Sequence, residues 1–330
     1  MHRRRFLECS ATATLSGLAV AVSPAYAQAY PSRPVRMVVP FPAGGPTDSF
    51  ARLYAASLSQ QIGQPVVVEN KAGAGGALGT MEVKRSAPDG YTLLFGTAST
   101  HALYNLIQKK PQYDALEDFA YVGVLGGAPV AFAVSPSMPR ALKSVIIAAK
   151  VNPGKYNYGS PGNGTLLHVA AERLKQLTSA PINHVPYKGS APALQDLLGG
   201  NIEMTVDTLG SLLPHHQAGR VRVVSVAAAK RVALAPDIPT VAESADLDKP
   251  FEAMLWNVVT APRDTPAQVV SQLAQATQRA MSDASLRSRL ESQAMFVDLH
   301  LGQAAAAAFV QAERAKWKPI VASLGDLTTG

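Results

Sequence analysis

Three short stretches of the sequence combine glycines with serine or threonine, the residue types that bind an anion without a cationic side chain. They are residues 41–48 (FPAGGPTD), 96–100 (GTAST) and 159–165 (GSPGNGT). Glycine lets the backbone approach a ligand closely, and free N–H groups at the start of a helix, aided by the helix dipole, hold a carboxylate. Three such stretches favour one shared anion site, with ordinary turns between strands and helices as the alternative.

The patterns that mark common enzyme sites are missing from the sequence. Tyr158 stands where the G-x-S-x-G motif of serine hydrolases requires its first glycine, and no serine has a lysine three positions later. Gly154-Lys155 is followed by Tyr156, which excludes a P-loop, and Leu78 replaces the third glycine of a dinucleotide-binding fingerprint. We therefore expect a protein without catalytic residues and without a cofactor.

The cysteine and histidine residues of the sequence also give little indication of thiol or metal chemistry. The single cysteine, Cys9, leaves no disulfide scaffold and no Cys-ligated metal site. The histidines are dispersed, and none forms the i, i+4 pair with an acid that a zinc hydrolase uses. We expect no metal, and most histidines to be surface or packing residues. His168 and His184 lie close to glycine-rich stretches and are the histidines to consider as ligand contacts.

Short β-branched runs alternate with helical patterns along the chain, which is typical of βαβ units on a largely parallel sheet. Strands are expected at residues 35–39, 66–69, 91–95, 121–125, 130–134, 182–185, 202–206, 221–227 and 253–260. Helices are expected at residues 49–62, from the turn at 73–76 toward 85, at 141–151, 165–177 and 193–198, and from 266 onward, including 303–310. In an open α/β sheet the three stretches then lie at the carboxyl ends of strands, where ligands bind.

The length of 330 residues suggests two domains of roughly 150 residues. The C-terminal part holds one apolar strand followed by helical sequence, which is too little to complete a domain, so we expect the chain to return to the first domain. The sequence thus predicts an α/β protein with two lobes. Lobe 1 comprises residues 28–128 and 256–330, lobe 2 comprises residues 129–255, and the crossings fall near 126–130 and 251–256.

Residues 1–27 have the three parts of an export signal. Arg3-Arg4-Arg5 precedes Phe6-Leu7, an apolar run follows from residue 11 to 22, and the stretch ends at Ala25-Tyr26-Ala27. The paired arginines resemble a twin-arginine signal. A membrane anchor is the alternative, but the run is shorter than the ~20 residues that a bilayer requires. We expect cleavage near Ala27 and a periplasmic location.

Charge and hydropathy indicate which partners to expect. Removal of residues 1–27 lowers the formal net charge from +7 to about +5, because three arginines and Glu8 are lost. The remaining basic residues are scattered among acids, so we expect no nucleic-acid partner. No later segment reaches 18 consecutive apolar residues, so we expect no membrane insertion. The mild basic excess is compatible with an anionic ligand and with an ordinary surface.

A series of motifs, in order, resembles the Bug family, the periplasmic substrate-binding receptors of tripartite tricarboxylate transporters. The matching stretches are 30–35 (YPSRPV), 40–45 (PFPAGG), 63–71 (GQPVVVENK), 73–76 (GAGG), 88–94 (PDGYTLL), 159–165 with His168, 184–189 (HVPYKG), 192–194 (PAL), 196–200 (DLLGG), 239–243 (PTVAE), 261–262 (AP) and 265–266 (TP). The resemblance implies a two-lobed clamshell that closes on a small organic acid and delivers it to membrane permease subunits. We expect a monomer, and presentation of the ligand to a membrane sensor is the alternative to delivery.

The resemblance also implies which residues face the ligand. They are Phe41, Ala43, Gly44, Gly45, Thr47, Asp48, Thr97, Ser99, Ser160, Gly162, Gly164, Thr165, His168, Tyr187, Lys188 and Asp207. The N–H groups of Gly44, Gly45 and Gly162, with the hydroxyls of Thr47, Thr97, Ser160 and Thr165, are expected to bind the carboxylates. Asp207 is expected to bind a ligand amino group or a water, and capping of a strand end is the alternative. Lys188 is expected to contact the ligand, and a position in a solvated turn is the alternative.

The chain departs from the pattern of similar receptors at two places. Trp256 is followed by Asn257-Val258-Val259, where a glycine is usual within two residues, which puts the backbone geometry near the second crossing in question. Arg263-Asp264 replaces the usual turn residues before Thr265-Pro266, a surface change with little expected effect.

Overall fold

The computed structural model of this chain describes residues 30–328. The export signal expected at residues 1–27 lies outside the described residues. Within 30–328, no helix is at once long enough and apolar enough to cross a membrane.

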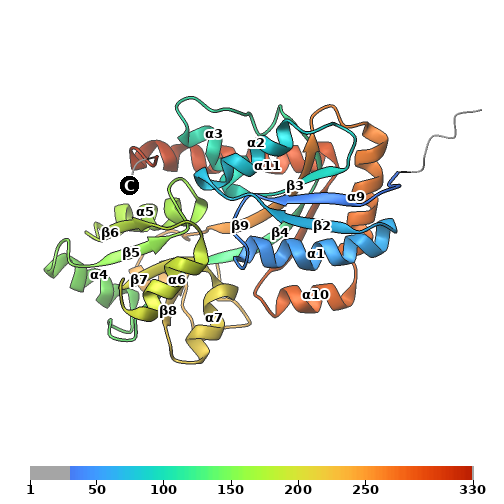
Figure 1. Cartoon of the computed structure of the whole chain (residues 1–330). Helices are drawn as coiled ribbons and strands as arrows, with labels where there is room; N and C mark the ends of the chain where they lie inside the picture. Colours follow the sequence, from blue (N-terminus) through green and yellow to red (C-terminus); the bar gives the residue numbers. More distant parts are fainter. Residues whose placement is uncertain (1–29, 329–330) are drawn as a thin grey trace, which may run out of the picture.

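One group of strands forms a sheet that we name sheet A (Figure 1). Its order is β2 (Val66–Asn70), β1 (Val35–Val39), β3 (Thr92–Thr97), β9 (Met254–Pro262) and β4 (Phe119–Val134), and β10 (Phe296–Leu301) also pairs with β4. β1 is parallel to β2 and β3, whereas β9 runs antiparallel to β3 and β4. We use lobe 1 for sheet A and the helices packed on it.

Helices cover both faces of sheet A because its strands are apolar on both sides. Met37 and Val39 pack in one cluster with α1 (Pro46–Ile62), α9 (Ala267–Met281) and α10 (Ala284–Glu291). Val38, between them, points to the opposite face and shares a cluster with α2 (Ala77–Lys84) and α11 (Gln303–Leu324). This alternation along β1 is the period of two that a strand imposes on its side chains. The remaining lobe 1 elements are short: η1 (Ala74–Gly76), the π-helix η2 (Ser99–Leu103) and α3 (Tyr104–Ile107).

A second group of strands forms sheet B. Its order is β4, β7 (Met204–Thr208), β5 (Asn157–Ser160) and β6 (Asn183–Pro186), and β8 (Arg222–Val226) also pairs with β4. The helices of this part are α4 (Leu142–Val151), α5 (Leu166–Thr178), α6 (Ser190–Gly199), α7 (Leu209–Gln217) and α8 (Val241–Ala245). We use lobe 2 for sheet B and these helices. The α/β class expected from the sequence is confirmed.

The long strand β4 belongs to both sheets. Its residues 119–129 pair with β9, and its residues 130–134 pair with β7 and β8. The sequence predicted two strands here, which is wrong, because Gly126 and Gly127 interrupt the β-branched pattern without ending the strand. A β-carbon on either glycine would lie 2.0 Å from a carbonyl oxygen of a neighbouring strand, so glycine is required for this close pairing.

The chain crosses between the sheets a second time at Ala253. The Ala253 N–H donates to the Ala227 carbonyl of lobe 2, and the Ala253 carbonyl accepts the N–H of Val130. β9 then continues through Asn257 as a regular partner of β3, with irregular register against β4. We propose for the folded chain the same division as before, residues 28–128 with 256–330 and residues 129–255.

Two strands lie where none was predicted. β5 is a four-residue strand of sequence NYGS, which lacks a β-branched residue. β10 interrupts the segment from 266 onward that was expected to be helical throughout, so that prediction is wrong. β10 is partly exposed and contains the polar residues Asp298 and His300, so its sequence lacks the apolar pattern of a buried strand. Its strand conformation depends instead on pairing with β4.

Candidate functional site

The first of the three stretches, residues 41–48, links β1 to α1 and is held in shape by Asp48. One oxygen of the Asp48 carboxylate accepts the Gly44 N–H and the Arg52 Nε–H, both at 2.9 Å. The other accepts Asn70 Nδ2, which also donates to the Phe41 carbonyl. Burial alone would raise the pKa of Asp48, but these hydrogen bonds hold it below its usual value. Asp48 therefore positions the loop.

The second stretch, residues 96–100, links β3 to η2. The Thr97 hydroxyl accepts the Ser99 N–H, and the Thr100 hydroxyl accepts the Thr97 N–H and donates to the Thr97 carbonyl. These local bonds close a tight turn, and Thr97 is fully buried inside it. Ser99 points outward from the turn, and its hydroxyl accepts the Leu166 N–H of lobe 2 at 3.0 Å.

The third stretch, residues 159–165, links β5 to α5. The Thr165 hydroxyl caps α5 by accepting the His168 N–H and donates to the Gly162 carbonyl. The Ser160 hydroxyl accepts the Gly162 N–H and bonds to Nε2 of His184 at 2.6 Å. The loop thus depends on its own polar side chains for its shape.

Two stacked histidines form hydrogen bonds with this third loop. The His168 and His184 rings are 4.1 Å apart and nearly parallel, and Tyr158 stacks on the far side of His184. Nδ1 of His168 accepts the Gly164 N–H at 3.1 Å. Burial lowers the pKa of His168 to about 4 and that of His184 to about 3, so both rings are neutral near pH 7. The hydrogen bond requires a neutral His168 with its proton on Nε2, because a protonated Nδ1 could not accept the Gly164 N–H.

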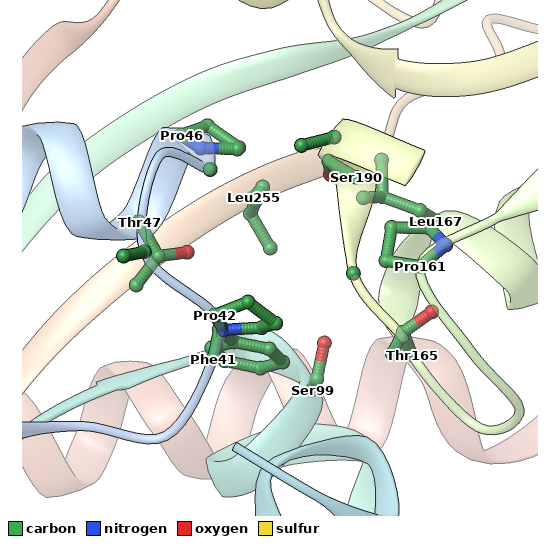
Figure 2. A pocket seen from close by; sticks show the side chains of 14 residues that line it. Phe41, Pro42, Pro46, Thr47, Ser99, Pro161, Thr165, Leu167, Ser190 and Leu255 are labelled. Atoms are coloured by element: carbon green, nitrogen blue, oxygen red, sulfur yellow. The ribbon is translucent and has the colours of Figure 1, made fainter. Parts of the chain in front are cut away.

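The three stretches meet at a narrow cavity between the lobes. Figure 2 shows side chains of lobe 1 on one side and of lobe 2 on the other, with Leu255 of β9 behind them. We name it the inter-lobe cavity. The predicted site residues that line it are Phe41, Ala43, Gly45, Thr47, Ser99 and Thr165.

A wider cavity adjoins the first. Three further predicted residues line this adjoining cavity: Gly162, Tyr187 and Lys188. Tyr187 donates its hydroxyl to Asp196 at 2.6 Å, and Lys188 is exposed. Phe41, Pro42, Pro161 and Gly189 line both cavities. Gly189 of lobe 2 lies against the Pro42 ring of lobe 1.

The remaining predicted residues line neither cavity: Gly44, Asp48, Thr97, Ser160, Gly164, His168 and Asp207. Their polar groups are engaged within the loops. The N–H groups of Gly44 and Gly162, expected to meet a ligand, donate instead to Asp48 and Ser160. These residues do not line either cavity and instead hold the lining residues in position.

Asp207 also lies behind the cavity wall. Its carboxylate accepts the Thr208 N–H at 2.7 Å and a hydrogen bond from the Ser190 side chain, and only 2% of the residue is exposed. Burial raises the pKa of Asp207 to about 7, even though both hydrogen bonds act to lower it. Ser190 itself lines the inter-lobe cavity.

Three helices begin at the inter-lobe cavity: α1, α5 and α6. Each presents first-turn residues to it, and residues 30–328 offer no hydrogen-bond partner for the N–H groups of Thr47, Leu167 and Ala191. Free N–H groups at the positive ends of helix dipoles are suited to bind an anion such as a carboxylate. The described lining contains no lysine or arginine.

Four lining residues lie outside the stretches that the sequence indicated: Leu167, Ser190, Ala191 and Leu255. The run Gly189-Ser190-Ala191-Pro192 has the signature of a helix start and could have identified the beginning of α6. Leu255 carries no such signal, because an apolar residue within a strand resembles any core residue. Within 30–328, no group of three or more His, Cys, Asp or Glu side chains is arranged to hold a metal.

Comparison with known proteins gives consistent matches. The family model for the tripartite tricarboxylate transporter family receptor matches residues 50–326. The protein BugT of Bordetella pertussis is 38% identical over 258 residues, which is 77% of each chain.

Solved structures match over nearly the whole fold. MatC of Rhodopseudomonas palustris, solved with bound malate, is 32% identical with a TM-score of 0.83, covering 88% of this chain and 100% of that chain. A second R. palustris protein, solved with adipate, is 34% identical with a TM-score of 0.85, covering 90% of this chain and 98% of that chain. The two-lobed architecture is therefore that of periplasmic binding proteins of this type.

Proposed function

The chain belongs to the tripartite tricarboxylate transporter family of receptors, and from that premise we propose that it captures a small organic carboxylate between its lobes in the periplasm. It is a solute-binding receptor and not an enzyme. We further propose that it is exported, that residues 1–27 are removed, and that it delivers its ligand to the membrane permease of the transporter.

The observation that carries this proposal is the convergence of α1, α5 and α6 on one cavity between the lobes. A hydrogen bond to a charged group contributes about 1.5–3 kcal/mol, and a favourably placed helix terminus adds up to about 2 kcal/mol. The apolar side chains of Leu167 and Leu255 complete the wall.

The relatives support the carboxylate class. Malate and adipate, the ligands of the two R. palustris structures, are both dicarboxylates. A carboxylate held by backbone N–H groups needs no arginine or lysine at the cavity, which agrees with the lining of this chain.

Isothermal titration calorimetry on residues 28–330 tests the proposal. The panel contains succinate, malate, adipate, citrate and benzoate. We expect at least one to bind with one site per chain and to be recovered unchanged. If a folded protein binds none of them, the carboxylate class is rejected.

A further inference from the structure

We infer that the receptor binds its carboxylate ligand together with a proton, and that Asp207 takes up this proton. The inference rests on the proposed carboxylate-binding function and specifies how protons regulate that same site. It follows from the place of Asp207 behind the inter-lobe cavity, from its hydrogen-bond partners and from the elements packed around it.

Asp207 is a buried carboxylate without a counter-charge. It lies near the end of β7, only 2% of it is exposed, and it accepts hydrogen bonds from the Thr208 N–H and the Ser190 side chain. Within residues 30–328, no lysine, arginine or histidine pairs with it. Asp48, the other carboxylate buried behind the wall, pairs with Arg52 at 2.9 Å. An unpaired buried charge is costly, so Asp207 is the one of the two that gains from a proton.

The histidine pair of lobe 2 lies on the other face of sheet B. Side chains alternate along β7, so Val206 packs in the cluster that contains Tyr158, and Asp207 points to the opposite face. His184 stacks on Tyr158, and His168 stacks on His184. These rings are therefore separated from Asp207 by the sheet and do not neutralise it.

The face that carries Asp207 is covered by α6 and α7. β4 places Ala131 opposite Asp207, and Ala131 packs in the cluster formed with these two helices. On α6, Asp196 is bonded to other side chains. On α7, the histidines 215–216 lie in the last turn, at the far end of the helix from Asp207. The polar side chain that these elements direct to Asp207 is that of Ser190.

The proton on Asp207 decides what Ser190 offers to a ligand. Ser190 is the first residue of α6 and lines the inter-lobe cavity (Figure 2). An ionised Asp207 only accepts, so it takes the Ser190 hydroxyl proton and leaves the oxygen lone pairs for the cavity. A protonated Asp207 donates to the Ser190 oxygen, and the Ser190 hydroxyl then donates to a ligand carboxylate. One proton thus converts Ser190 from an acceptor into a donor.

The charge of the ligand acts in the same direction. A carboxylate in the inter-lobe cavity lies beyond Ser190 from Asp207, and a like charge nearby disfavours the ionised form. The pKa of Asp207 is about 7 in the protein without ligand, because burial raises it. Ligand binding therefore raises this pKa further, and the affinity falls as the pH rises above 7. Asp48 does not contribute, because its hydrogen bonds hold its pKa below the usual value.

Calorimetry in buffers of different ionisation enthalpy measures the proton uptake. At pH 7.5 about a quarter of Asp207 is protonated before binding, so a rise of its pKa to about 8 or above gives about half a proton or more per ligand. The affinity of the parent for a panel acid is expected to fall about fivefold or more from pH 7 to pH 8.5. An uptake of zero overturns the inference while leaving carboxylate binding intact. If no panel acid binds to the folded protein, the proposed function itself fails.

Asp207→Asn is the matched variant. Its amide has the shape of a protonated carboxyl group and donates to Ser190 at every pH without titrating. We expect it to take up no proton through this position and to bind with nearly the same affinity at pH 7 and pH 8.5. Equal proton uptake by parent and variant overturns the assignment to Asp207.

Infrared difference spectroscopy of the parent needs no variant. Addition of ligand at pH 7.5 should produce the carbonyl stretch of one protonated carboxylic acid, and a spectrum without this band overturns the inference.

Discussion

The Ser99 hydroxyl of lobe 1 accepts a hydrogen bond from the Leu166 backbone N–H of lobe 2 at 3.0 Å. Both residues are buried, and Leu166 is the first residue of α5. One N–H of that helix therefore joins the lobes, while the next, that of Leu167, has no hydrogen-bond partner within residues 30–328. The hydrogen bond that joins the lobes therefore lies next to the proposed position of the carboxylate.

Removal of this bond should weaken ligand binding. Ser99→Ala leaves the Leu166 N–H without its acceptor in the closed form, which costs about 0.5–1.5 kcal/mol and hence about 2- to 10-fold in affinity. Calorimetry with the tightest-binding acid measures the change. Ser292→Ala, at an exposed serine of lobe 1, is the control and should bind like the parent. Unchanged affinity in Ser99→Ala would show that the bond does not contribute to closure.

Gly189 should be required for closure because of its contact with Pro42. A β-carbon on Gly189, which has a φ of 113°, would lie 2.7 Å from the Pro42 ring. Gly189→Ala is expected to hold the lobes apart and to lower affinity at least about tenfold. Gly200→Ala is the matched control, since Gly200 also has a positive φ but its β-carbon would meet nothing within 4 Å. Both variants should lose thermal stability, and equal binding by both would refute the closure role.

The stacked histidines predict a pH dependence of stability. The pKa of His168 is about 4 in the folded protein, below its ordinary value of 6.5. The unfolded chain therefore binds more protons between these values, so the His168 contribution is complete above about pH 6.5 and falls as the pH drops toward 4. At pH 5 the loss is about 2 kcal/mol for this residue alone. His184 acts in the same direction.

Urea unfolding at pH 7.5 and pH 5 measures this dependence. In His168→Asn the side-chain oxygen can still accept the Gly164 N–H but does not titrate. The parent should therefore lose more stability than the variant between the two pH values. Asp207, whose raised pKa gives a dependence of opposite sign, is present in both proteins and cancels in the comparison. A parallel pH dependence of parent and variant would contradict the prediction.

Glu313 should stabilise the second crossing through the two tryptophans. Its carboxylate accepts the Trp256 Nε1–H at 3.0 Å and the Trp317 Nε1–H at 3.3 Å. Glu313→Ala leaves both buried indole donors without this acceptor, and we expect a loss of about 1–3 kcal/mol in the free energy of unfolding. Glu291→Ala, at an exposed glutamate, serves as the control. Tryptophan emission reports on both residues directly, and an unchanged unfolding midpoint would contradict the role of Glu313.

The sequence predicted the site-forming loops better than it predicted their contacts. Glycine with serine or threonine at the end of a strand is a local signal, and all three such stretches contribute to the cavity lining. Which polar atoms face the cavity depends on which of them already hydrogen-bond to neighbouring residues. Asp48 and Thr97, for example, form hydrogen bonds within their own loops. Leu255 could not be predicted, because only the crossing of β9 behind the cavity gives it a role.

The strands differ in how far local sequence predicts them. The strands β1 and β2, both rich in valine, were located from local sequence, because β-branched residues favour the extended conformation. The continuity of β4 through Gly126 and the existence of β10 depend on pairing between distant segments. Those contacts leave little trace in the sequence of either segment alone.

A crystal structure of residues 28–330 with malate, or with the tightest-binding acid of the panel, tests the central claim most directly. We expect a carboxylate in the inter-lobe cavity, with its oxygens within hydrogen-bonding distance of N–H groups of Thr47, Leu167 or Ala191. A ligand held only in the adjoining cavity or on an outer face, with those N–H groups unused, would contradict it.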